Sequence, residues 1–344
     1  MTASPTTSSA ASSATTSPTA PLRIGIMSFA HVHTPGFVAL LSSMGCQLVG
    51  ADSDAERAKA SAERYGIEVV EDYATLLDRE LDGVVICAEN VFHRELTELA
   101  AAAGVYVLTE KPIATTIADA RAMIAACDKA GVGLMTAFPM RWSPPMARLV
   151  SMAKGGRLGQ VVAMSGTNPG TCPGGWFTQP ELSGGGSVVD HTVHVGDLMC
   201  EITGAVPVSV YAQTNALITP EFGIETGGLI SITFSDQTIG TIDASWSRLP
   251  TYPTWGGVTL EVVGTDGVVA VDAFADRASL YSQKASWLNF GADPNRSMVA
   301  EFLSSVREKR MPTPSGTDGL NASAIAVAAY KSAATHTKVA AFED

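Results

Sequence analysis

The chain has 344 residues, enough for roughly two domains, and 46% of them are apolar, which is ample material for a core. Its formal net charge of -12 argues against nucleic acids and anionic membranes as partners, because their phosphate groups would be repelled. The five cysteines are scattered and odd in number, so they indicate neither a disulfide framework nor a cysteine metal site. We therefore expect a cytoplasmic globular protein with small-molecule partners.

Residues 1–21 differ in composition from the rest. They consist almost entirely of Ser, Thr, Ala and Pro, and 1–20 contain no Lys, no Arg and no sustained apolar segment. Such a composition predicts a disordered tail and not a secretory signal. Since no later apolar run approaches the roughly 20 residues that a bilayer requires, we also expect no membrane association.

From residue 22, short apolar runs alternate with helical patterns. In the expected helix at 92–103, apolar residues recur on one face, and Gly104 ends it. This alternation predicts a doubly wound parallel sheet, a Rossmann domain of the α/β class, over 22–140. The expected strands are 22–27, 47–51, 83–87, 105–108 and 133–137.

The run Tyr106-Val107-Leu108 ends abruptly before Glu110-Lys111-Pro112. A lysine directly after a buried strand lies at the carboxyl edge of a parallel sheet, where ligands bind. The proline restricts the backbone and is compatible with a cis peptide bond. From these residues alone, an exposed lysine paired with Glu110 is an equally good interpretation.

Two positions test whether the domain binds a dinucleotide, and the end of the second strand is one of them. Asp52 lies there, where an acidic residue commonly holds the ribose hydroxyls of NAD. Ser53 stands where an arginine would favour NADP, although Arg57 is near enough in sequence to reach that site. A helix-capping aspartate is the alternative for Asp52.

The turn after the first strand, the other test position, contains no glycine. Ser28, Ala30 and His33 occupy the three positions of the usual glycine fingerprint, so we expect the turn to form without a positive φ. Amides at the next helix N-terminus, with Ser28 or His33 as side-chain donors, could still bind pyrophosphate. Judged on this turn alone, a loop with solvated histidines and no cofactor is the favoured interpretation.

Four segments occur together in an informative order and spacing. The segment 82–93 corresponds to a motif that consists of a strand, Thr-Pro-Asn and a following His. Asn90 and His93 match this motif, and Ala88 and Glu89 replace its Thr-Pro. The others are Glu110-Lys111-Pro112, the segment 137–144, in which Pro139 replaces a usual Asn, and 184–197, a glycine run with Asp-x-x-x-His. Together they resemble the Gfo/Idh/MocA family of sugar and polyol oxidoreductases over nearly the whole chain from residue 22. The glycine-free turn is the main departure from that family's pattern.

The resemblance implies NAD as cofactor and a catalytic helix over the fourth segment. On a helix Asp190, His194 and Asp197 project from one face. The resemblance assigns His194 as general acid/base, Lys111 as its partner at the reacting oxygen and Asp190 as a ligand of a substrate hydroxyl, which suits alcohol oxidation. A purely structural histidine is the alternative for His194. The expected cofactor-binding residues are Ser28, Phe29, Ala30, His33, Asp52, Ala88, Asn90, His93, Glu110 and Lys111.

His191 raises the alternative of a metal site, because it adds a second imidazole beside Asp190, His194 and Asp197. On a helix His191 lies about 100° from Asp190, so it can share a ligand with His194 but not easily complete a set of three. We therefore expect no metal ion.

The loop 168–177 precedes the catalytic helix and carries two adjacent aromatic residues. Trp176 could stack on a sugar ring while Arg141 and Trp142 approach from the other side, or the aromatic residues could only anchor the loop. An Arg141 that faced the site would favour an acidic or sulfonated sugar. The expected substrate-binding residues are Lys111, Arg141, Trp142, Trp176, Asp190, His191 and His194.

Residues 141–344 are expected to form a second domain for substrate binding and oligomerisation. Strand patterns at 160–167 and 228–282 predict an α+β fold with a large, mostly antiparallel sheet and helices on one side. Its other face would be exposed unless a second subunit covered it, so we expect a homodimer or homotetramer. Helical patterns from 298 and over 321–334 are expected to pack back on the core.

The leading expectation is thus an NAD-dependent dehydrogenase or reductase acting on a sugar, polyol or sugar derivative. An NAD-dependent glycosidase, which oxidises a hydroxyl transiently, eliminates the aglycone and returns the hydride, would need the same residues. A sugar-binding protein without catalysis is the non-enzymatic alternative. Retention of Lys111, Asp190 and His194 argues against it, because binding alone needs no acid/base pair.

Overall fold

Six parallel strands form the first sheet, in the order β3-β2-β1-β4-β5-β6. This is the strand order of a dinucleotide-binding Rossmann fold. The computed structural model describes residues 20–289 and 292–343, so the predicted tail at 1–21 falls almost wholly outside the described residues. The strands are β1 Arg23–Met27, β2 Gln47–Ala51, β3 Glu68–Val70, β4 Gly83–Ile86, β5 Tyr106–Thr109 and β6 Leu134–Thr136.

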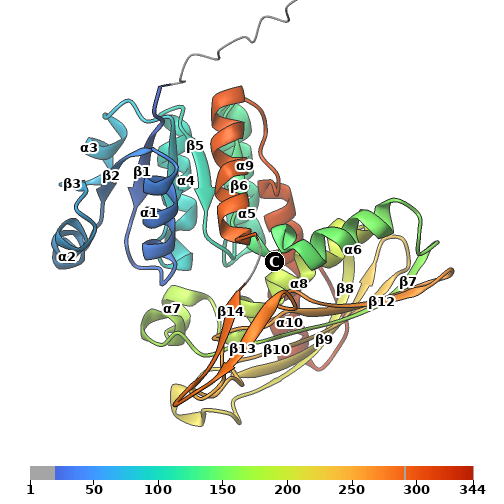
Figure 1. Ribbon diagram of the computed structural model, residues 1–344. Coiled ribbons are helices and arrows are strands. Elements are labelled where there is room, and N and C mark those ends of the chain that lie inside the picture. The colour runs from blue at the N-terminus through green and yellow to red at the C-terminus, as the bar shows by residue number, and fades with distance from the viewer. Residues whose placement is uncertain (1–19, 290–291, 344) are drawn as a thin grey trace, which may run out of the picture.

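Helices cover both faces of this sheet, as Figure 1 shows. Helices α4 and α5 pack on one face, and α1 packs on the other. The helical elements of this part are α1 Thr34–Ser43, α2 Ala55–Tyr65, α3 Tyr73–Leu77, the short η1 Asn90–Phe92, α4 His93–Ala102, α5 Ile117–Ala130 and η2 Pro139–Trp142.

The predicted parallel sheet is confirmed, and its five predicted strands agree with the observed ones to within one residue at each end. The strand β3 was not predicted, because it has only three residues and pairs at the sheet edge beside β2. So short a run carries too little hydrophobic pattern to be distinguished from a loop.

The second sheet has seven strands in the order β12-β11-β7-β10-β9-β8-β15. Every pair is antiparallel except β7 with β10, so the predicted mostly antiparallel sheet is confirmed. A separate hairpin, β13 with β14, extends from it. The strands are β7 Val161–Pro169, β8 Pro207–Asn215, β9 Gly227–Phe234, β10 Ile239–Ser245, β11 Thr259–Gly264, β12 Val268–Asp272, β13 Arg277–Tyr281, β14 Ala285–Asn289 and β15 Val339–Ala340. The helical elements are α6 Pro144–Lys154, η3 Gly175–Thr178, α7 Pro180–Ser183, α8 Ser187–Thr203, η4 Pro220–Phe222, α9 Pro294–Glu308 and α10 Gly316–Thr335.

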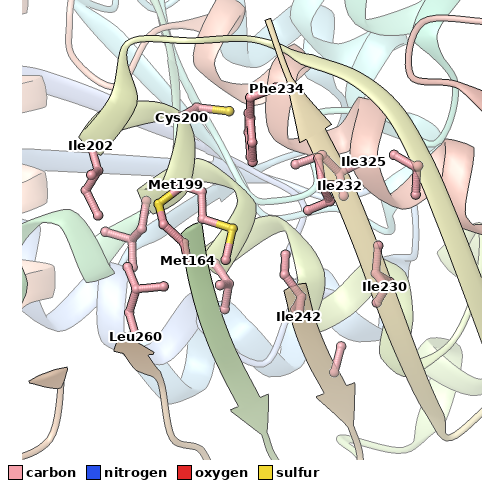
Figure 2. Close-up of a cluster of buried hydrophobic side chains, with 14 of the residues drawn as sticks. Met164, Met199, Cys200, Ile202, Ile230, Ile232, Phe234, Ile242, Leu260 and Ile325 are labelled. Carbon is pink, nitrogen blue, oxygen red and sulfur yellow. The ribbon is translucent and has the colours of Figure 1, made fainter. Parts of the chain in front are cut away.

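Helix α8 lies directly on one face of the seven-stranded sheet. Figure 2 shows the apolar cluster between them, in which Met199 faces Met164 and Ile232. Two glycines let the helix approach: a Cβ at Gly166 would lie 2.3 Å from Val195, and one at Gly228 would lie 2.6 Å from Val188. The helix that carries the predicted catalytic residues is therefore fixed by close packing.

Helix α9 packs on the first sheet, although it follows the second sheet in sequence. Its residues Met298 and Phe302 join the cluster that contains α1 and strand β1. A Cβ at Gly83 in β4 would lie 3.0 Å from Phe302. The division predicted at 140/141 thus differs from the observed packing, because the chain returns to the first lobe at 294 to cover the face beside α1.

Among residues 20–289 and 292–343, no helix is long and apolar enough to cross a membrane.

Candidate active site

The carboxyl ends of β1, β4 and β5 meet the first turns of α8 where the two lobes join. Lys111 follows β5 and is buried, and its Nζ donates to Asp190 Oδ1 at 2.6 Å. The ammonium also lies 3.3 Å from the Asp190 carbonyl oxygen. The alternative of an exposed lysine paired with Glu110 is therefore wrong, and two residues expected in the same site are in contact.

The Asp190 carboxylate is buried, and three nitrogen groups lie within 3.2 Å of its oxygens. Besides Lys111, the indole of Trp246 donates to Oδ2 at 3.0 Å, and His191 Nε2 lies 3.2 Å from the same oxygen. Burial alone would raise the pKa of Asp190, but Lys111 and His191 outweigh it and hold that pKa well below its usual range. Asp190 is thus an anion at neutral pH. Sequence reasoning missed Trp246, since nothing in the sequence links it to position 190.

His191 lies behind Asp190. Its Nδ1 is 2.8 Å from the carbonyl oxygen of Asn168 and 3.1 Å from that of Ser245, and a Cβ at Gly170 would lie 2.3 Å from its ring. Both ring nitrogens therefore face oxygen acceptors within the protein. This arrangement fixes His191 as a support for Asp190 and leaves it no free nitrogen for substrate, contrary to the expectation of direct binding.

His194 lies one helical turn after Asp190 and differs from His191. Its ring is buried with an edge-on contact to Phe138, at 6.2 Å between centroids, and its Nδ1 has no hydrogen-bond partner in the described part of the chain. Burial and, next, the charge of Lys111 lower the pKa of His194 well below its usual value. The ring is therefore neutral at pH 7, close enough to Lys111 to feel its charge, and available to accept a proton.

Arg141 and Asp197 form an ion cluster away from these groups. The Arg141 guanidinium binds both Asp197 oxygens, at 2.6 and 2.7 Å, and also reaches Glu201 and Asp318 at 2.8 and 2.9 Å. Such a fork is fully used by protein carboxylates. Arg141 therefore does not face the substrate as expected, and the condition for an acidic or sulfonated sugar is not met. Asp197 shares the helix face of His194 but points to this cluster.

The two predicted aromatic contacts also lie elsewhere. Trp142 packs against the cluster that contains α9 and α1. Trp176 stacks on Phe177 at 3.9 Å, and its indole donates to the Ala30 carbonyl oxygen at 3.1 Å. The loop that carries Trp176 thus anchors the second lobe on the turn after β1, which supports the alternative that its aromatic residues serve as anchors.

The glycine-free turn does adopt a glycine-like conformation. Ser28 has a φ of 68°, so the expectation of a turn without positive φ is wrong. Its strain is offset by contacts, since the Ser28 amide donates to Ala51 O at 2.9 Å and the next amide, of Phe29, donates to Asp52 Oδ2 at 2.7 Å. His31 N also donates to Cys87 O at 2.9 Å. The amides of the turn thus tie it to the ends of the neighbouring strands β2 and β4. Few of these amides remain for a phosphate.

Asp52 is buried, and Arg57 covers it. Arg57 Nε and Nη2 bind the two carboxylate oxygens at 2.7 and 2.8 Å, and Nη1 reaches Glu89 at 3.0 Å. The helix cap at the start of α2 is Asp54, whose side chain accepts from the amides of Glu56 and Arg57, so the capping alternative for Asp52 is wrong. Arg57 joins the loops after β2 and β4 across the place where a ribose would bind.

Replacing Arg57 with alanine should increase the preference for NADH over NADPH. The change would free both oxygens of Asp52 for ribose hydroxyls and would leave a bare carboxylate that repels a 2′-phosphate. We expect a shift of roughly tenfold or more, the scale of one hydrogen bond to a charged group. Parallel titrations with the two reduced nucleotides measure it, with Arg64→Ala, further along α2, as control. A shift toward NADPH would contradict this role.

Asn90 and His93 follow β4 and bind protein atoms. His93 is buried, with Nδ1 2.9 Å from Pro112 O and Nε2 3.2 Å from Ala88 O, so both nitrogens face carbonyl oxygens of the protein. Asn90 Nδ2 donates to Ser183 O at 2.8 Å, while its Oδ1 is buried without a partner. His93 was expected to bind the cofactor. Instead it joins two loops of the site.

Two family models match consecutive parts of the chain. The model of an NAD-binding Rossmann-fold oxidoreductase family matches residues 24–138, and the GFO/IDH/MocA C-terminal domain model matches 146–270. D-apiose dehydrogenase from Paraburkholderia graminis is 28% identical over 314 residues, covering 84% of this chain and 81% of that protein. Myo-inositol 2-dehydrogenase from Thermotoga maritima is 26% identical over 328 residues, covering 90% and 96%.

Solved structures share the fold. Levoglucosan dehydrogenase in complex with NADH and levoglucosan has a TM-score of 0.82 at 21% identity, covering 94% of this chain and 100% of that one. GenD2 from gentamicin A biosynthesis, in complex with NAD, has a TM-score of 0.84 at 23% identity, covering 94% and 97%. With both domain models matched in order, this chain belongs to the Gfo/Idh/MocA family of oxidoreductases, with an NAD-binding Rossmann domain.

Proposed function

We propose that this oxidoreductase transfers a hydride between a hydroxyl-bearing carbon of a sugar, polyol or sugar derivative and the nicotinamide of NAD. The observation that carries the proposal is the buried Lys111–Asp190 pair, 2.6 Å apart, beside a neutral His194 whose Nδ1 has no partner. An ammonium and a free imidazole at the carboxyl edge of a Rossmann sheet suit proton removal from an alcohol.

Three features beside the turn after β1 support dinucleotide binding, although most amides of the turn itself bind protein atoms. Ser28 supplies the positive φ that a tight phosphate turn needs, and Asp52 lies at the end of β2. Asn90 Oδ1 is a buried acceptor without a partner, in the loop after β4. A dinucleotide held by these residues would supply the hydride acceptor of the reaction. The predicted contacts of Ser28, Phe29, Ala30, His33, Ala88, Glu110 and Lys111 with NAD remain part of this proposal.

In the oxidation direction, His194 accepts the hydroxyl proton as the carbonyl forms and the hydride leaves carbon. Lys111 stabilises the negative charge that develops on the oxygen, because its ammonium is held at the site by Asp190. Asp190 remains an anion and holds Lys111 Nζ at the site. In reduction the same imidazole returns a proton to the oxygen. Thus one proton, one hydride and one carbon–oxygen double bond account for each turnover.

The substrate class is supported by relatives of this chain. D-apiose dehydrogenase and myo-inositol 2-dehydrogenase act on a sugar and a cyclic polyol, as their names state. A glycosidase with transient oxidation would use the same three residues. Retention of an acid/base group beside Lys111 favours either enzyme over a silent binding protein.

A sugar and polyol panel tests the proposal and separates the enzymatic alternatives. The protein is incubated with NAD and each compound, and NADH is measured by absorbance while products are identified by mass spectrometry. Net NADH with an oxidised product supports the dehydrogenase. Aglycone release without net NADH would indicate the glycosidase. If the panel gave neither net NADH nor aglycone release, the result would contradict hydride transfer.

The outer face of the seven-stranded sheet supports a homodimer or homotetramer. Tyr211, Leu229 and Ile239 are 38%, 65% and 54% exposed there, and a hollow of about 360 Å³ is lined in part by Tyr211 and Leu229. An exposed apolar sheet face of this kind commonly pairs with another subunit.

The cysteines support a location for the protein. All five are free thiols, which suits a reducing compartment, and we place the protein in the cytoplasm.

Leu229→Asp should dissociate the proposed oligomer, because it introduces a charge into the sheet face that the second subunit would bury. Light scattering after size exclusion should give a multiple of 35.7 kDa for the wild type and a single-chain mass for the variant. Leu217→Asp, at an exposed position outside the sheet, is the matched control. A single-chain mass for the wild type would overturn the assembly.

A further inference from the structure

A group of two histidines and a carboxylate lies beside the turn after β1. His31, His33 and Glu110 each present one ligand atom, and these atoms lie within 4.8 Å of one another. His33 Nδ1 is 2.8 Å and His31 Nδ1 is 3.6 Å from Glu110 Oε1. We propose that His31, His33 and Glu110 bind a divalent first-row transition metal, such as zinc.

The charge balance of Glu110 is the first argument. Its side chain is 1% exposed, yet the groups around it are two imidazoles and Lys111, whose ammonium is bonded to Asp190. Its second oxygen receives only the amide of Lys111, at 3.1 Å. Buried carboxylates are paired with a cation or coordinate a metal. A bound cation would complete the compensation of this one.

His31 supplies the second argument. Its Nε2 is buried and has no hydrogen-bond partner, and its Nδ1 receives only a 3.2 Å bond from the His33 amide. An amide donates only to an unprotonated nitrogen, so His31 Nδ1 is unprotonated, and a metal bound there would displace this long bond. The structural histidines His93 and His191 differ, because both of their nitrogens face acceptors in the protein.

The separations of the ligand atoms suit a metal. With bonds of about 2.0 to 2.2 Å, neighbouring ligands lie about 2.8 to 3.6 Å apart over the angles of tetrahedral and octahedral sites. The observed 2.8 and 3.6 Å fall at the two limits. Two imidazoles and one carboxylate form a common set for zinc and iron, with positions left for other ligands.

The surroundings provide a shell and an entry path. The Trp176 and Phe177 rings lie 5.9 and 5.3 Å from His31, and Trp255 lies 6.1 Å from His33. An apolar shell limits water access and strengthens binding at such a site. The His33 side chain is 36% exposed, so an ion can enter from that side.

Cobalt titration of the full-length, chelator-treated protein tests the site. We expect one Co²⁺ per chain with a visible absorption spectrum, displaced by Zn²⁺. His31→Gln and His33→Gln should each weaken Co²⁺ binding by at least about tenfold, the lower end of what even outer-shell changes cost. His336→Gln, an exposed histidine outside the group, is the control, and thermal unfolding checks that each variant is folded.

The proposal would be overturned if Co²⁺ did not bind, or if it bound equally well to both His31→Gln and His33→Gln. It would also be overturned if only the replacement of His194 abolished Co²⁺ binding. NADH titration of the same chelator-treated protein separates this inference from the proposed function. Loss of the metal site with retained NADH binding leaves hydride transfer standing.

Discussion

His194→Ala is expected to lower kcat by roughly 10²- to 10⁴-fold, the usual contribution of a general acid/base. Within residues 20–289 and 292–343, the imidazole is a neutral group beside Lys111 with an unpartnered nitrogen, and alanine supplies no proton acceptor in its place. NADH affinity should be retained, because the ring lies on α8 and not in the turn after β1. Stopped-flow turnover together with an NADH titration measures both quantities.

The pH profile provides a second readout of the same residue. Because burial and Lys111 lower the pKa of His194, the base form persists below its ordinary pKa. The acidic limb of kcat/KM for oxidation should therefore lie below about pH 6.5, the ordinary value for histidine. His336→Ala should keep the wild-type profile. Near-normal turnover in His194→Ala would contradict the assignment.

Lys111→Met is expected to reduce both activity and stability. The change leaves the Asp190 anion buried with Trp246 and His191 as its remaining partners, and breaking one side of a buried ion pair costs about 3 to 5 kcal/mol. The developing alkoxide also loses its nearby cation. Chemical denaturation and steady-state kinetics measure the two effects.

A double variant separates the two roles of Lys111. Lys111→Met combined with Asp190→Asn removes both charges, while the new amide oxygen can still accept from Trp246. Much of the lost stability should return, whereas kcat should remain low. Recovery of both would show that Lys111 acts only in folding, and full stability in Lys111→Met alone would contradict the ion pair.

Much of this architecture could be predicted from the sequence. Apolar runs with helical segments between them determine a parallel sheet, and the segment 47–51 coincides with β2. The presence of Lys111 and Asp190 in one site could be expected because a family resemblance linked segments 79 positions apart, whereas their ion pair was not predicted. Period alone also placed Asp190 and His194 on one helix face. These features depend on local pattern or on a recognised combination of motifs.

Other features depend on contacts that no local pattern contains. Trp246 donates to Asp190 across 56 positions, and Glu110 meets His33 across 77. The expectation for Arg141 was wrong for the same reason, because its three carboxylate partners come from α8 and α10. Ser28 adopts a positive φ against its residue type, since the ends of β2 and β4 bind the turn.

The NADH titration of the wild-type protein by nicotinamide fluorescence, with NADPH in parallel, tests the central claim most directly. The account predicts saturable NADH binding at one site per chain, because the Ser28 turn, Asp52 and Asn90 follow the adjacent strands β1, β2 and β4 at one sheet edge. Binding of neither nucleotide would contradict it, because both the dehydrogenase and the glycosidase alternatives require NAD.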